Sequence, residues 1–183
     1  MKNEQEYCYD CQNKKHIFID GRALWVHRGR VSDAVYALKY KNKKIYGEIF
    51  GREMAKVYAE FLKKRNVEML IPVPLYKTRR RKRGYNQAEI LAKAISKETG
   101  IPVDSKSLIR VKGTTAQKEL NDKERRRNIK HAFSVCRNIN AGNVAVIDDI
   151  YTTGSTIDEA ADTLLASGVG NVYFLVISIG QGF

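Results

Sequence analysis

VIDDIYTTGST, residues 146–156, is the stretch that decides the fold class. An apolar run at residues 144–147 leads into it and predicts a buried strand. A helical pattern over residues 155–166 follows, and the apolar run 172–177 predicts another strand. Strand, helix and strand at this spacing form a βαβ unit, whose crossover favours a parallel sheet covered on both faces. We therefore expect an α/β fold.

The acids and small residues of this stretch are typical of a phosphate and sugar site. In an open parallel sheet, ligands bind beyond the carboxyl ends of the strands. Small hydroxyl residues and a glycine leave backbone N–H groups free to surround a phosphate, and the helix start adds its positive dipole end. Asp148 and Asp149 could accept hydrogen bonds from vicinal hydroxyls such as those of ribose. The predicted phosphate-binding residues are Tyr151, Thr152, Thr153, Gly154, Ser155 and Thr156.

A simpler interpretation is an Asp-rich loop in which Ser155 or Thr156 caps a helix. It accounts for one hydroxyl residue, but not for two acids followed by Thr-Thr-Gly. Two carboxylates beside a phosphate also need positive charge nearby. Mg²⁺ at Asp148 and Asp149, directly or through the ligand, would supply it together with basic loops.

The chain before this stretch divides into a small appendage and a larger domain. The apolar runs 16–19 and 23–26 flank an Asp-Gly turn signal and predict a hairpin. Apolar positions at three- and four-residue steps predict two amphipathic helices between residues 31 and 62. The other expected elements are a strand at 69–74, a helix at 86–98 ending at Gly100, a strand at 108–109 and a polar, mobile loop at 111–123. We place the boundary near Gly29, between an N-terminal appendage (1–29) and one α/β domain (30–183).

Bulk composition limits the class of protein. With 183 residues, 43% of them hydrophobic, the chain can bury one core but is short for two. No apolar run approaches the roughly 18 residues of a spanning helix, so we expect a cytoplasmic protein without membrane insertion. Three cysteines agree with a reducing compartment. The formal net charge of +13 should attract phosphates, whether of a small molecule or of nucleic acid.

The stretch 146–156 resembles the phosphoribosyl-diphosphate (PRPP) signature of type I phosphoribosyltransferases, and further motifs are similar to the ComF family of competence-associated proteins. In order, these motifs cover the chain from about Leu70 to its end. They are Arg83-Gly84-Tyr85-Asn86-Gln87-Ala88, then Leu91-Ala92, then Thr114, Gln117, Leu120, Arg125, Asn128 and Ala132-Phe133. The resemblance implies a type I phosphoribosyltransferase-like parallel sheet flanked by helices.

The same resemblance implies roles for several segments. Asp148 and Asp149 would be the catalytic acids that hold the ribose. The loop after the first core strand, residues 74–85, would bind the diphosphate and stabilise its departure with Mg²⁺. A flexible loop, residues 112–124, would close over the site and exclude water. The candidate residues are Lys77, Arg79, Arg81 and Arg83 in the diphosphate loop, and Thr114, Gln117 and Arg125 in or beside the flexible loop.

The resemblance to ComF proteins implies a part in the uptake of transforming DNA, beside a helicase-type ATPase partner. Nothing between residues 15 and 44 names an acceptor, so it stays open whether the chain is a phosphoribosyltransferase, that is, a glycosyltransferase acting on PRPP. Tyr151 and Trp25 could stack on a base, although a core position is the commoner reading for such aromatics.

The Cys pair suggests a metal site of a different kind. ComF proteins often carry an N-terminal zinc ribbon with two such pairs, and this chain has only Cys8 and Cys11. A structural zinc needs four ligands, for which His16 and His27 are conceivable substitutes. Cys136 fits a buried thiol better. The appendage is thus a candidate remnant of a zinc ribbon, and zinc is a secondary expectation.

Three functional hypotheses follow. The first is a PRPP-type ligand-binding domain with Mg²⁺, serving DNA uptake or nucleotide metabolism. The second is a non-catalytic adaptor that uses the basic runs 77–83 and 125–127 to bind single-stranded DNA or a competence partner, with the pocket as a sensor. DNA binding would be non-specific and salt-dependent, because only Tyr76 and Tyr85 accompany the first basic run. A zinc-dependent nucleic-acid module ranks last.

Overall fold

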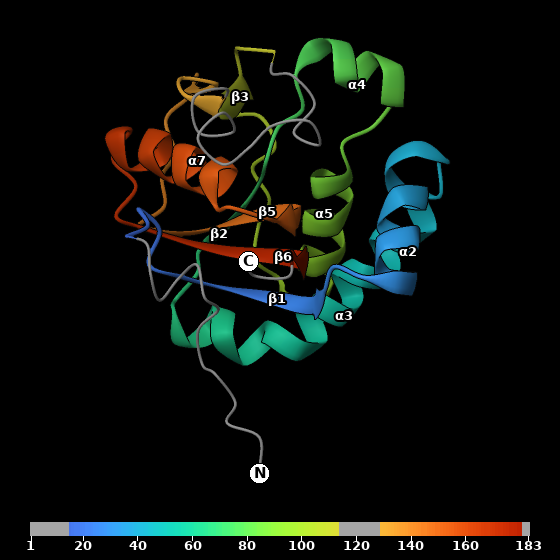
Figure 1. The fold of residues 1–183 in the computed structure, drawn as a ribbon. Helices are drawn as coiled ribbons and strands as arrows, with labels where there is room; N and C mark the ends of the chain where they lie inside the picture. The colour runs from blue at the N-terminus through green and yellow to red at the C-terminus, as the bar shows by residue number, and fades with distance from the viewer. Residues whose placement is uncertain (1–14, 114–128, 181–183) are drawn as a thin grey trace.

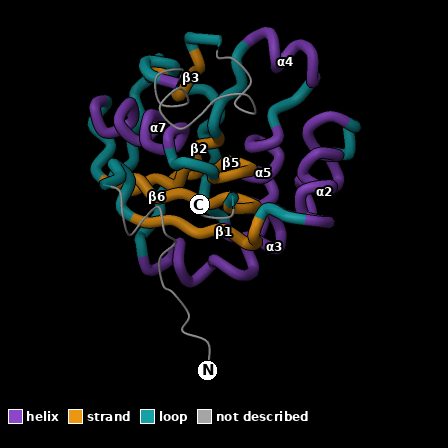
Figure 2. The backbone as a smooth tube through the Cα atoms, in the orientation of Figure 1, coloured by secondary structure: helices purple, strands orange, loops and turns teal. Residues whose placement is uncertain are grey.

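The central sheet brings together segments from both ends of the chain. In a computed structural model that describes residues 15–113 and 129–180, four strands form this sheet, all of them parallel. Figure 2 shows them at the centre of the molecule with helices around them. Their spatial order is β1 (Asp20–Val26), β6 (Asn171–Ile179), β5 (Asn143–Tyr151) and β2 (Met69–Pro72). The predicted α/β fold with a parallel sheet is confirmed.

Helices cover both faces of the sheet, as the apolar strands require. Helix α7 (Ser155–Ala166) lies on one face and α3 (Lys44–Lys64) on the opposite face (Figure 1). Helices α2 (Gly29–Tyr40) and α5 (Gln87–Thr99) pack on the same side as α3. Because side chains alternate along a strand, Val144 and Val146 of β5 pack in the cluster with α7. Ala145 and Ile147 pack in the cluster with α3 and α5.

The remaining elements lie near the carboxyl ends of β2 and β5. Helix α4 (Lys77–Arg83) follows β2. Strands β3 (Leu108–Arg110) and β4 (Phe133–Val135) form a separate antiparallel pair whose Leu108 and Phe133 join the α7 cluster. The expected loop at 111–123 falls largely on residues 114–128, and Thr114, Gln117 and Arg125 therefore lie outside the described residues.

The predicted N-terminal hairpin is wrong. Residues 20–26 form one strand, β1, which pairs in parallel with β6 from Asp20↔Tyr173 to Val26↔Ile179. Gly21 lies inside this strand, where a Cβ atom would come within 2.1 Å of the Phe174 ring. The glycine thus permits a close approach in the sheet rather than a turn. Asp20 is buried and forms ion pairs with Arg22 at 2.5 Å and Arg65 at 2.8 Å.

The described part of the expected appendage is therefore an edge strand of the main sheet. Residues 1–14 lie outside the described residues, so an appendage there stays a prediction. Across residues 15–113 and 129–180, no helix combines the length and the apolar character needed to span a membrane.

Candidate functional site

The signature stretch lies where β5 ends and α7 begins. Strand β5 runs further than the predicted 144–147, through both acids to Tyr151. A short turn leads to Gly154, which precedes α7 with φ of +72°. A Cβ atom at this glycine would lie 2.5 Å from Tyr151 Oη, so both backbone conformation and space favour glycine. The segment is thus placed at the carboxyl end of a central parallel strand, where the sequence predicted a ligand site.

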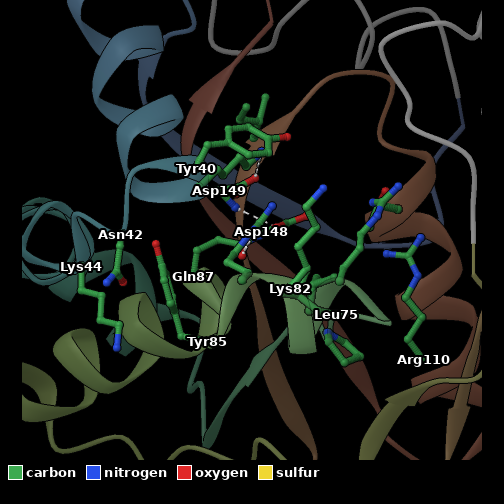
Figure 3. A pocket seen from close by; sticks show the side chains of 18 of the residues that line it. Tyr40, Asn42, Lys44, Leu75, Lys82, Tyr85, Gln87, Arg110, Asp148 and Asp149 are labelled. Atoms are coloured by element: carbon green, nitrogen blue, oxygen red, sulfur yellow. Dashed lines mark hydrogen bonds and ion pairs between the residues drawn. The ribbon is translucent and has the colours of Figure 1, made fainter. Parts of the chain in front are cut away.

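A cavity of about 920 Å³ opens beside this strand end. Among the described residues, six basic side chains and two carboxylates line it. Figure 3 shows the carboxylates of Asp148 and Asp149 near the middle of the labelled side chains. The basic residues are Lys39, Lys44, Arg79, Lys82, Arg83 and Arg110. Their excess of positive charge makes the cavity suited to an anion.

Asp149 forms an ion pair with a lysine of helix α2. Its carboxylate is 4% exposed, and its Oδ1 lies 2.9 Å from Nζ of Lys39 on α2. Its Oδ2 is buried and has no hydrogen-bond partner among the described residues. A buried acceptor without a partner is costly, so this carboxylate oxygen lowers the stability of the ligand-free protein.

Asp148 carries a perturbed carboxyl group. Burial and then the neighbouring charge of Asp149 raise the pKa of Asp148 to about 7, against the opposing effects of Lys39 and Arg110. Its Oδ1 accepts a hydrogen bond from the backbone N–H of Asp149 at 2.8 Å. The surroundings therefore disfavour the ionised form of Asp148, even with basic residues nearby.

These residues fit Mg²⁺ that is coordinated jointly by the protein, water and a ligand. Mg²⁺ prefers carboxylate and other oxygen donors and keeps several waters. Asp148 and Asp149 supply such oxygens. Elsewhere in residues 15–113 and 129–180, as here, no group of three or more His, Cys, Asp or Glu residues is arranged to hold a metal. The two acids would thus need ligand oxygens to complete the shell.

The basic segment after β2 is a helix, α4, where we expected a loop. Of the four predicted diphosphate residues, Arg79 and Arg83 line the cavity, whereas Lys77 and Arg81 do not. Lys82 joins them instead. Helical spacing explains why Arg79, Lys82 and Arg83 line the cavity together, because residues three and four apart share one face of a helix.

The motif at residues 83–88 fixes this helix relative to the sheet. Gly84 ends α4 with φ of +80°. The side chain of Asn86 accepts a hydrogen bond from the N–H of Ala88 at 3.1 Å and donates one to the carbonyl oxygen of Val73 at 3.0 Å. The guanidinium of Arg83 donates to Gln87 Oε1. The motif thus joins the start of α5 to the end of β2 and orients a cavity arginine.

The predicted phosphate-binding residues divide into two groups. Thr152 and Thr156 line the cavity. Thr153 and Ser155 are buried, and their hydroxyl oxygens lie 3.0 Å apart. The ring of Tyr151 is 2% exposed and stacks on Phe174 with a centroid distance of 5.1 Å. Hydroxyl contacts to a ligand are therefore available from two of these residues, and the ring of Tyr151 belongs to the core.

Part of the cavity lining consists of residues that sequence reasoning missed. Lys39 and Tyr40 come from the end of α2, Asn42 from the turn after it and Lys44 from the start of α3. The basic run of residues 39–44 could have indicated that these residues bind an anion. Because the run is far from the signature in sequence, nothing in the sequence indicated that the two segments line one cavity.

Arg110, at the end of β3, was also missed. Burial, followed by repulsion from Arg79, lowers the pKa of Arg110 to about 10, while the charge of Asp148 opposes that shift. Its guanidinium lies 5.4 Å from the centroid of the Phe133 ring. The residue therefore contributes a partly desolvated charge near the acids, which strengthens its attraction for an anion.

The residues considered for zinc do not form a site in the described part of the chain. Cys8 and Cys11 lie outside it. His16 contacts Asp158, and the ring nitrogens of His27 each lie 2.9 Å from a serine hydroxyl. Cys136 is exposed, so the prediction of a buried thiol is wrong. The reason is that β4 ends at Val135 and the chain leaves the core there.

The sequence is similar to curated competence and DNA utilization proteins. Competence protein F of Haemophilus influenzae is 43% identical over 108 residues, which are 57% of this chain and 47% of that protein. DNA utilization protein YhgH of Escherichia coli O157:H7 is 35% identical over 105 residues, 57% of this chain and 46% of that protein. Competence protein ComFC of Bacillus subtilis is 25% identical over 169 residues, 88% of this chain and 67% of that protein. The chain thus spans about half the length of the first two relatives.

Comparison with solved structures finds weaker likenesses. A purine phosphoribosyltransferase from Pyrococcus horikoshii has a TM-score of 0.41 at 16% identity, covering 69% of this chain and 72% of that one. The hypoxanthine-guanine phosphoribosyltransferase of L. donovani has a TM-score of 0.45 at 13% identity, covering 73% and 71%. No protein-family model matches the chain.

The sequence matches and the placement of the signature agree. The competence and DNA utilization proteins share up to 43% identity with the chain. The signature stands at the carboxyl end of a central strand in a parallel sheet flanked by helices. Over part of its length, the chain is therefore similar to curated competence and DNA utilization proteins.

Proposed function

We propose that the cavity binds a phosphoribosyl ligand such as PRPP together with Mg²⁺. One observation carries the proposal. Two adjacent carboxylates, Asp148 and Asp149, face the same cavity as two signature threonines and a wall of arginine and lysine side chains. A phosphoribosyl diphosphate needs all three chemistries, because it combines a diol, a terminal phosphate and a diphosphate.

Each part of the ligand has a matching part of the cavity. The 5-phosphate would lie at the start of α7, contacting Thr152, Thr156 and the backbone N–H groups of the turn. The ribose hydroxyls would donate hydrogen bonds to the carboxylates of Asp148 and Asp149. The diphosphate would contact the basic wall formed by Arg79, Lys82 and Arg110.

A transfer reaction would break the bond between the anomeric carbon of ribose and a diphosphate oxygen. Arg79, Lys82 and Arg110 would stabilise the negative charge that develops on the departing diphosphate. Asp148 and Asp149 would hold Mg²⁺, which would supply further positive charge against the departing diphosphate. Tyr40 and Asn42, which also line the cavity, would be available to contact the acceptor.

Calorimetric titration tests the proposal. The protein is titrated with PRPP in the presence of Mg²⁺ and with ribose 5-phosphate, and the double variant Asp148→Asn, Asp149→Asn is compared. We expect micromolar binding of PRPP and a loss of about 100-fold in the variant, because two charged acceptors are removed. Asp162→Asn on the exposed side of α7 is the matched control and should bind normally. Absence of binding for both ligands to the unmodified protein would overturn the proposal.

A second candidate function is the non-catalytic adaptor, and one observation favours it. Tyr36 and Tyr40 are 48% and 59% exposed, and their ring centroids lie 4.9 Å apart. Lys41 Nζ lies 5.9 Å from the centroid of the Tyr36 ring. Exposed aromatic rings with lysines beside them can stack on bases of single-stranded DNA while the cations contact its backbone. A competence partner, such as a helicase-type ATPase, is the alternative occupant of this surface.

Fluorescence anisotropy with a labelled oligodeoxythymidine separates the two functions. The double variant Tyr36→Ala, Tyr40→Ala should weaken DNA binding about tenfold or more, as the loss of base stacking predicts. The Asp148→Asn, Asp149→Asn variant should leave it unchanged. If the aromatic variant binds DNA as tightly as the unmodified protein, this surface is not a DNA site, and binding to a partner ATPase is then the measurement that decides the adaptor function.

A further inference from the structure

The turn that joins β5 to α7, residues 152–156, is contacted from the core side by His16, a residue that does not line the cavity. His16 precedes β1 in the chain, and its side chain is 5% exposed. Its Nδ1 lies 2.9 Å from Oδ2 of Asp158, in the first turn of α7. The next backbone N–H, of Ile17, donates to Asp158 Oδ1 at 3.0 Å. Both oxygens of one carboxylate are thus bound by consecutive residues of the N-terminal segment.

His16 also reaches the turn itself. Its Nε2 lies 3.3 Å from Tyr151 Oη. A Cβ atom built on Gly154 would come within 2.9 Å of His16 Cε1 and 2.5 Å of Tyr151 Oη. The histidine and tyrosine therefore contact Gly154 from the core side, opposite the face where Thr152 and Thr156 line the cavity.

The rings that make this contact are themselves held in place. His16 stacks on Phe18 with a centroid distance of 4.7 Å and an interplanar angle of 16°. Phe18 packs edge-on against Phe174 at 4.8 Å, and Tyr151 stacks on the same Phe174. A rigid aromatic group therefore supports the turn, since each ring is fixed by a neighbour.

The hydrogen-bond roles follow from the partners. Asp158 as a carboxylate can only accept, so Nδ1 of His16 donates to it. In the neutral ring Nε2 is then the acceptor, and the hydroxyl of Tyr151 donates to it. The backbone N–H of Asp158 donates to the carbonyl oxygen of Gly154 at 2.8 Å. His16 thus connects the N-terminal segment to Tyr151, before the turn, and to Asp158, after it.

We propose that His16 is a positioning residue for the phosphate-binding turn. It holds residues 152–156 in the ligand-binding conformation without touching the ligand. The ordering of this turn therefore depends on the ordering of the segment before β1. The consequence for affinity rests on the proposed function, whereas the ordering of the turn does not. A pre-formed turn lowers the entropic cost of binding a phosphate, so loss of His16 should weaken binding.

Hydrogen exchange in the ligand-free protein tests the ordering. We compare His16→Ala with His16→Asn, whose side-chain N–H can replace the Nδ1 donor to Asp158. Glu159→Gln is the matched control on the same helix, because Glu159 Oε1 accepts from the N–H of His131 at 2.5 Å and is remote from the turn in its contacts. We expect amide exchange at residues 153–156 to be about tenfold faster in His16→Ala and near normal in the other two variants.

Two results would overturn the proposal at this step. Unchanged exchange of the turn in His16→Ala would show that the histidine does not order it. Equal acceleration in Glu159→Gln would show a general loosening of α7. Exchange at the central strands β5 and β6 serves as the internal reference, because it reports on the stability of the whole fold.

Titration with ribose 5-phosphate, and separately with inorganic phosphate, tests the consequence. His16→Ala should bind ribose 5-phosphate about tenfold more weakly, and His16→Asn within about twofold of the unmodified protein. Normal affinity in His16→Ala, at a temperature where the variant is folded, would overturn the positioning role. If the unmodified protein binds neither probe, the proposed function fails, and the exchange experiment alone decides whether His16 orders the turn.

Discussion

The two halves of β5 contrast sharply in composition although they belong to one strand. Residues 144–147 are apolar and fully buried, and they alternate between the two cores. The following residues include Asp148 and Asp149, which line the cavity and of which Asp149 has one buried oxygen without a partner among the described residues. The first half therefore stabilises the fold, whereas the second half holds charge at a cost in stability. Such a local cost in stability is typical of a binding site whose charged groups are satisfied only when ligand is bound.

The largest effect should come from the apolar half. Ile147→Ala removes a side chain with 0% exposure from the cluster formed with α3 and α5. Because a cavity remains, we expect a loss of about 2–5 kcal/mol in the free energy of unfolding. Urea denaturation measures it, with Asp162→Asn expected within about 0.5 kcal/mol of the unmodified protein. A small loss for Ile147→Ala would remove the contrast between the halves.

The acidic half should show the opposite response, and it should depend on pH. The pKa of Asp148 is raised from 3.8 to about 7 by burial and by Asp149. Between these values the folded state keeps a proton that the unfolded state has released, so stability falls as pH rises through this range. Asp148→Asn removes that dependence and should become more stable than the unmodified protein as pH increases.

Urea unfolding of both proteins at about pH 4.5 and about pH 7.5 checks this prediction. The difference in the free energy of unfolding should shift in favour of Asp148→Asn at the higher pH. If the difference is the same at both values, the carboxyl of Asp148 is not destabilised by its surroundings, and the acidic half carries no cost of the proposed kind.

A smaller effect should distinguish the two faces of α4, which supplies positive charge to the acidic half. Lys82 lines the cavity and Lys77 does not, although both substitutions to Gln remove one charge from the same helix. We expect Lys82→Gln to weaken PRPP binding about fivefold and Lys77→Gln less than twofold. Calorimetric titration measures both. Equal losses of affinity in the two variants would mean that the ligand interacts with the overall positive charge of α4 and not with Lys82 in particular.

The smallest effect should occur at the end of β5. Tyr151→Phe removes a hydroxyl that lies 3.3 Å from His16 Nε2 and keeps the stacked ring. The free energy of unfolding should fall by less than about 1 kcal/mol, as measured by urea denaturation. A larger loss would mean that this hydroxyl contributes more to the fold than its long contact indicates.

Local pattern predicted several elements of this protein well. The helix predicted at 155–166 is α7, and the helix predicted at 86–98 is α5, which ends at Gly100 as expected. Their apolar spacing and terminal residues are properties of neighbouring positions, so they can be read without the rest of the fold. The same holds for the strand before the acids, although β5 continues past it because β6 pairs with its polar half.

Other predictions failed where a distant partner decided the outcome. The Asp-Gly pair at residues 20 and 21 has the composition of a turn, but pairing with β6 and the ion pairs of Asp20 make it part of a strand. The basic run after β2 became a helix, and its geometry selected Lys82 in place of two predicted residues. Propensity is weak compared with such tertiary contacts.

By itself, the sequence determined the α/β class, the signature at the end of a strand and the acids that characterise it, because these depend on residues adjacent in the chain. Only the tertiary structure decided which basic residues face those acids. Lys39, Lys82 and Arg110 come from three separate elements, and no spacing along the chain relates them. It also revealed His16 beside the turn that leads into α7, since its contact with Asp158 joins residues 142 positions apart and depends on the placement of β1 beside β6.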